Sequence, residues 1–108
     1  ATEPELRLYL DSKTLLLNAK RPSARIGRDT AADLVVADTQ SSRRHAEIEL
    51  RGDKFVLIDR SSNGTFVQID GEKEFLLSRE EVVLRGRGHF SLGRSCANSP
   101  QVVDFVCL

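Results

Sequence analysis

Three short segments of the chain combine arginine, serine and glycine with almost no large apolar residue. These segments are residues 25–28, 39–45 and 59–65. A phosphate dianion is bound best by planar guanidinium groups, hydroxyl groups and free backbone N–H groups that converge on it. Arg28, Arg43, Ser42 and Ser62 supply such side chains, and glycine beside them permits close approach of the backbone. Together the segments predict a site for one phosphorylated side chain.

Each segment alone also has a simpler interpretation. Arg28 can be a surface charge, residues 42–45 the solvated start of a strand, and Asn63-Gly64 a type I′ hairpin turn. The whole chain carries 16 basic and 16 acidic side chains, so its formal net charge is zero. A non-specific nucleic-acid binder would show a marked basic excess. Positive charge confined to a few loop residues favours recognition of one compact anion instead.

The elements that must position these segments are short β-strands. Apolar residues alternate with polar ones, for example at Leu6, Leu8 and Leu10, which is typical of strands with one buried face. Short runs rich in β-forming residues, separated by turn residues, occupy 5–10, 14–18, 23–27, 34–37, 46–51, 54–59, 65–70, 73–77, 80–85, 89–93 and 101–107. Eleven short strands without a convincing helix predict an all-β fold, an eleven-stranded β-sandwich. In such a fold the loops at one end usually carry the function.

Length and composition limit the class of protein further. The 108 residues suit one domain spanning 1–108. No apolar run approaches the roughly 18 residues of a membrane-spanning helix, and no signal-peptide pattern opens the chain. Cys96 and Cys107 form neither a CxxC pair nor a disulfide framework, so reduced thiols are expected. We therefore expect a cytoplasmic domain without a membrane partner.

The three segments form an ordered set of motifs. The motifs are Ile26-Gly27-Arg28, Ser42-Arg43-x-His45 and Ser62-Asn63-Gly64-Thr65, followed by Leu84…Gly88-x-Phe90-x-Leu92-Gly93. In order and spacing they resemble the forkhead-associated (FHA) domain, a module that binds phosphothreonine peptides. The resemblance covers about residues 5–106 and implies an eleven-stranded β-sandwich. Residues 75–86 are similar to bacterial FHA modules joined to class III nucleotide cyclases.

The resemblance implies ligand contacts for five residues. Arg28, Ser42 and Arg43 would contact the phosphate, and Ser62 would add a hydroxyl or backbone contact. Asn63 would hydrogen-bond the peptide main chain beside the phosphothreonine. The implied partner is a phosphothreonine-containing protein or peptide of Ser/Thr-kinase signalling, either separate or in the same polypeptide. No cofactor is implied.

Other residues are implied to support these contacts. Four would shape the loops without touching ligand: Gly27, His45, Gly64 and Thr65. Gln40 and Arg94 flank the binding loops and are expected to influence the preference three residues after the phosphothreonine. His45 follows Ser42 by three residues, which also fits a nucleophile and its base, but no oriented aspartate or oxyanion device accompanies them. We therefore expect His45 to brace a loop.

Three other functions compete with phosphothreonine binding. A phosphate-independent protein-interaction domain, such as an oligomerisation or regulatory module of a larger enzyme, would use a face of the sandwich. A nucleic-acid binder would need aromatic support, whereas Tyr9 and the five phenylalanines fall mostly at core-like positions. An enzyme or a metal protein is not expected, because no paired acid and base or P-loop occurs, and the histidines and cysteines lack ligand spacing.

Overall fold

A computed structural model describes residues 3–108 and contains two β-sheets. Its strands are β1 (Leu6–Leu10), β2 (Lys13–Leu17), β3 (Ser23–Gly27), β4 (Leu34–Val35), β5 (Ala46–Arg51), β6 (Lys54–Asp59), β7 (Thr65–Ile69), β8 (Phe75–Leu77), β9 (Glu81–Leu84), β10 (Arg87–Leu92) and β11 (Val103–Cys107). A short 3-10 helix, η1 (Cys96–Asn98), lies in the last connection. The eleven strands confirm the all-β prediction. Within the described residues, no helix is long and apolar enough to cross a membrane.

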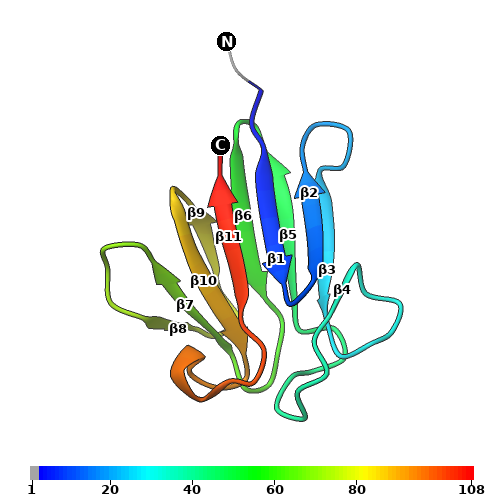
Figure 1. The fold of residues 1–108 in the computed structure, drawn as a ribbon, viewed down its shortest axis with the longest axis vertical. Coiled ribbons are helices and arrows are strands. Elements are labelled where there is room, and N and C mark those ends of the chain that lie inside the picture. The colour runs from blue at the N-terminus through cyan, green and yellow to red at the C-terminus, as the bar shows by residue number, and fades with distance from the viewer. Residues whose placement is uncertain (1–2) are drawn as a thin grey trace.

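The strands form a sandwich of two sheets (Figure 1). The six-stranded sheet has the order β2-β1-β11-β10-β7-β8, and the five-stranded sheet has the order β4-β3-β5-β6-β9. β3 and β4 pair in parallel, whereas the other neighbouring strands pair antiparallel. Because β1 pairs with β11, the first and last strands lie side by side in one sheet.

The alternation of apolar residues places one set of side chains between the sheets. Leu6 of β1 is fully buried, as are Ile26 of β3 and Ile48 of β5. Phe90 and Phe105, from the neighbouring strands β10 and β11, have ring centroids 6.5 Å apart. Burial of a side chain of this size contributes about 1.5–3 kcal/mol. The core therefore fixes the strand ends from which the loops extend.

The loops after β3, β4, β6 and β10 leave the sandwich at the end opposite the start of β1 and the end of β11 (Figure 1). β3, β4 and β6 run in the same direction, because β3 pairs in parallel with β4 and antiparallel with β5, which in turn pairs antiparallel with β6. The loops gathered there comprise residues 28–33, 36–45, 60–64 and 93–102. We call this end of the sandwich the loop end.

Candidate functional site

The end of β3 lies against the loop between β4 and β5. The Arg28 backbone N–H donates to the Ser42 carbonyl oxygen at 3.0 Å, and the Asp29 N–H donates to the Arg43 carbonyl oxygen at 3.2 Å. A Cβ atom on Gly27 would lie 2.1 Å from that Arg43 oxygen, far inside van der Waals contact. Glycine at this position therefore lets the two segments touch. The contact brings Arg28 and Arg43 together.

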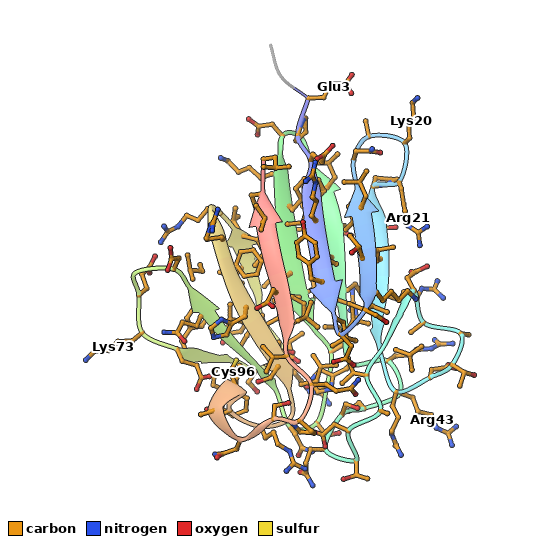
Figure 2. All side chains as sticks on the ribbon, viewed as in Figure 1. Glu3, Lys20, Arg21, Arg43, Lys73 and Cys96 are labelled. Atoms are coloured by element: carbon orange, nitrogen blue, oxygen red, sulfur yellow. The ribbon has the colours of Figure 1, made fainter. Side chains whose placement is uncertain are left out.

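Arg28 and Arg43 line one cavity at the loop end. The cavity measures about 310 Å³, and Asp29 and Thr30 complete its lining. Both arginine side chains are exposed, and Figure 2 shows Arg43 extending outward from this end of the molecule. Within residues 3–108, neither arginine forms an ion pair with a carboxylate. Their guanidinium groups are therefore available to an anion from outside the chain. We call this space, at which the sequence predicts phosphate binding, the phosphate cavity.

Ser42, Ser62 and Asn63 also lie at the loop end. The Ser62 backbone N–H donates to the Ser42 Oγ across 3.4 Å, a long hydrogen bond. Because a serine hydroxyl both accepts and donates, Ser42 can still donate its own hydrogen to a ligand. Asn63 Nδ2 donates to the Gln40 carbonyl oxygen at 3.0 Å, which joins the β6–β7 loop to the β4–β5 loop. The structure thus brings the five predicted contact residues to one end, and their contact with a peptide stays a prediction.

His45 is fully buried and connects two of these loops. The Ser42 N–H donates to His45 Nδ1 at 2.9 Å, which leaves the ring proton on Nε2. Nε2 in turn donates to the Gly64 carbonyl oxygen at 2.8 Å. The ring therefore ties the segment that carries Ser42 to the turn at Gly64. With both nitrogens bonded to backbone groups and no exposed surface, the ring is poorly placed to act as a base.

The titration of His45 leads to a prediction about stability. Burial lowers the pKa of His45 below its ordinary value, although the Gly64 carbonyl and the Asp59 carboxylate oppose this change. The unfolded chain takes up a proton on His45 near pH 6.5, whereas the folded chain does so only at lower pH. The free energy of unfolding should therefore fall as the pH drops through 6.5, by up to about 1.4 kcal/mol between about pH 7.5 and 5.5. Urea unfolding at the two pH values measures the difference.

A His45→Gln variant is the control for this pH dependence. Its free energy of unfolding should change much less between the same two pH values, because the titrating ring is absent. A hydrogen bond from the Cys96 N–H lowers the pKa of Glu74, and the Arg51 guanidinium lowers that of Glu81, so these two carboxylates titrate below this window. An equal loss of stability in both proteins would refute the assignment to His45.

Asp59, a buried carboxylate at the end of β6, organises the turn that follows. Its Oδ1 accepts hydrogen bonds from the hydroxyl groups of Ser61 at 2.6 Å and Thr65 at 2.8 Å. Its Oδ2 accepts the Arg79 backbone N–H at 2.8 Å. The Ser61 hydroxyl oxygen accepts the Gly64 N–H at 2.7 Å. These bonds hold the β6–β7 loop in one conformation, a role that the sequence analysis did not assign to Asp59.

Asp38 anchors the rim of the loop end. Its buried Oδ1 accepts hydrogen bonds from Arg94 Nη2 at 2.9 Å and from the Gln40 N–H at 3.0 Å. Gly93 packs against Gln40, since a Cβ atom on Gly93 would lie 2.2 Å from the Gln40 carbonyl oxygen. Gln40 and Arg94 therefore share one anchor at the loop end. Their influence on peptide preference stays a prediction.

The two cysteine thiols are poor nucleophiles. Burial raises the pKa of the Cys96 thiol to about 11, and it also raises the pKa of the Cys107 thiol. Both cysteines are free, and a thiol with a raised pKa stays protonated at neutral pH. Among residues 3–108, no three His, Cys, Asp or Glu side chains are grouped so that they could hold a metal ion.

Sequence comparison points to one family. The family model of the FHA domain matches residues 24–93, which include all five predicted contact residues. The glycogen accumulation regulator GarA of Mycolicibacterium smegmatis is 34% identical over 68 residues, which cover 62% of this chain and 43% of GarA. The chain therefore matches less than half of the length of this relative.

Solved structures share the same two-sheet architecture. The first FHA domain of Mycobacterium tuberculosis Rv1747 superposes with a TM-score of 0.74 at 21% identity, covering 98% of both chains. At that identity the likeness supports the fold alone. Mycobacterium tuberculosis EmbR, solved in complex with a low-affinity phosphopeptide, has a TM-score of 0.66 at 29% identity, covering 94% of this chain and 24% of EmbR.

Proposed function

This chain belongs to the FHA domain family, and we propose that its loop end binds phosphothreonine-containing peptides in Ser/Thr-kinase signalling. In this proposal Arg28 and Arg43 bind the phosphate through their guanidinium groups, and Ser42 binds it through its hydroxyl group. Ser62 adds a further donor, and Asn63 binds the peptide main chain. The regulatory role named for GarA and the phosphopeptide bound to EmbR support a signalling module that binds phosphothreonine.

The phosphate cavity is the observation that carries the proposal. Its two exposed arginines, which are not ion-paired within the described chain, converge from the β3–β4 and β4–β5 loops. Charge-assisted hydrogen bonds contribute about 1.5–3 kcal/mol each. Four such bonds approach the roughly 8 kcal/mol of a micromolar complex. Ordering of a flexible peptide offsets part of this gain, and contacts through Asn63 add to it.

We also propose a domain organisation and a general role for the chain. Residues 1–108 form one domain with a core of about 5–106, and this domain binds a ligand rather than catalysing a reaction. Balanced charge and two free thiols support action in the cytoplasm without a nucleic-acid or membrane partner. The phosphothreonine lies in a separate partner or in the same polypeptide. An association with a class III nucleotide cyclase stays a prediction from the sequence.

Titration of one peptide in three forms tests the proposal. A degenerate phosphothreonine library first selects the sequence, which is then prepared with phosphothreonine, phosphoserine or unmodified threonine. We expect the phosphothreonine form to bind with a micromolar Kd, and the unmodified form to bind at least about a hundredfold more weakly because it lacks the charged acceptor. Equal affinity for these two forms would contradict the proposal and support a phosphate-independent interaction domain.

A further inference from the structure

A second basic cavity opens beside the loop end, on the outer face of the five-stranded sheet. It measures about 330 Å³. Its lining includes Arg25 of β3, Arg43 and Arg44 before β5, and Arg60 after β6. Arg25 is exposed between two buried neighbours and lies opposite Glu47 in the pairing of β3 with β5, which places both side chains on the outer face. We call this space the side cavity.

Arginines outnumber carboxylates in the side cavity. Four arginines and two acids, Asp29 and Glu47, give its lining a net charge of +2, although the chain as a whole is neutral. Glu47 is paired with Arg60, and the Asp29 carboxylate accepts a backbone N–H within its own loop. Within residues 3–108, Arg25 and Arg44 form no ion pair. Among the described residues, Arg25 and Arg44 are therefore exposed guanidinium groups without an ion-pair partner, and Arg43, which also lines the phosphate cavity, is a third.

The side cavity adjoins the phosphate cavity, because Arg43 and Asp29 line both. An extended peptide advances about 3.3 Å per residue, so groups a few residues apart can occupy neighbouring cavities. When a phosphothreonine is bound in one cavity, a second group on the same peptide meets the other at a high effective concentration.

We infer that the side cavity binds a second anionic group, a phosphate or a carboxylate, on the same phosphothreonine peptide. The inference rests on the proposed function, since the first phosphate brings the peptide to the loop end. Arg25 and Arg44 bind the second anion through charge-assisted hydrogen bonds. Arg60 neutralises Glu47, which would otherwise repel that anion. The preferred ligand is then a phosphothreonine segment that carries a second phosphate or an acidic residue.

The test uses three peptides of one sequence and three forms of the protein. The peptides carry phosphothreonine alone, phosphothreonine with a second phosphothreonine, or phosphothreonine with a glutamate at that second position. The second phosphothreonine or the glutamate is placed in turn at each position from about one to about four residues before or after the first phosphothreonine. The proteins are the native chain, the Arg25→Ala/Arg44→Ala variant and a Lys54→Ala/Arg87→Ala control. The control removes the same charge from exposed positions at the starts of β6 and β10. Kd values are measured at one fixed salt concentration.

At the best spacing, the second anion should strengthen binding to the native protein at least about tenfold. The Arg25→Ala/Arg44→Ala variant should reduce this gain to less than about twofold and bind the singly phosphorylated peptide within about threefold of the native affinity. The control variant should keep the gain. If only the second phosphate strengthens binding, phosphate is the ligand of the side cavity. If glutamate strengthens binding as well, the side cavity accepts either anion.

Two results would overturn the inference. One is the absence of a gain at every spacing, and the other is a gain that persists in the Arg25→Ala/Arg44→Ala variant. If the singly phosphorylated peptide still binds better than its unmodified form, only the inference fails. If it does not, the proposed function fails, and the inference fails with it.

Discussion

Replacement of Arg28 with alanine is expected to lower the affinity for a phosphothreonine peptide at least about tenfold, because each charge-assisted hydrogen bond to the phosphate contributes about 1.5–3 kcal/mol. The fold should remain intact. Arg28 bonds to Ser42 through its backbone N–H, which alanine keeps, and its side chain is exposed. Isothermal titration measures the affinity, and thermal unfolding measures Tm.

Arg87→Ala is the matched control for this experiment. Arg87 is an exposed arginine at the start of β10, paired in register with Val106 near the end of the chain. We expect its replacement to change peptide affinity by less than about twofold. An Arg28→Ala protein that folds normally and keeps full affinity would eliminate Arg28 as a phosphate anchor. Equal losses in the two variants would indicate that overall charge, rather than the phosphate cavity, governs binding.

Replacement of His45 with alanine is expected to reduce the free energy of unfolding by about 3 kcal/mol or more, because it opens a cavity and breaks two hydrogen bonds. The Ser42 N–H and the Gly64 carbonyl oxygen both lose their partner on the ring. Since these bonds tie together the two loops that carry Ser42 and Asn63, peptide affinity should fall as well. Urea unfolding gives the stability, and titration of the folded fraction gives the affinity.

His89→Ala is the control for the His45 variant. His89 is only half-buried on β10, and its Nε2 lies 3.1 Å from the Gln68 Oε1. We expect its loss to lower the free energy of unfolding by less than about 1 kcal/mol and to leave peptide affinity unchanged. Similar losses in both variants would argue against a special bracing role for His45.

The strands were predictable because each depends on local chemistry. β5 and β6 begin and end at the predicted residues, 46–51 and 54–59, where runs rich in apolar residues stand between turn residues. Gly52 between them has a φ of 64°, a conformation that glycine adopts without strain. The 3-10 helix at 96–98 was not predicted. It is three residues long and has no side-chain cap, so the sequence contains little to indicate it.

The contacts within the loops were predictable only in part. Arg28, Ser42 and Arg43 could be selected because their side chains suit a phosphate. Asp59 and Asp38 could not be selected in this way, because the Arg79 N–H and the Arg94 guanidinium group that donate to them are distant in sequence and become neighbours only in the folded chain. The available signal for Asp59 was a lone carboxylate at the end of an apolar strand. The side cavity depends on the register of β3 against β5, which one sequence does not specify.

The position of the first and last strands limits which phosphothreonines of its own polypeptide the domain can bind. The start of β1 and the end of β11 lie opposite the loop end (Figure 1), and the molecule is 41 Å long in its largest dimension. A tether that leaves β1 or β11 and returns along the flank must cover most of this length, which takes about a dozen extended residues at about 3.3 Å each. A threonine close to either end of the sandwich therefore cannot reach the guanidinium groups of its own molecule. A threonine on a long tail can reach them, and one on a neighbouring molecule needs no tail at all.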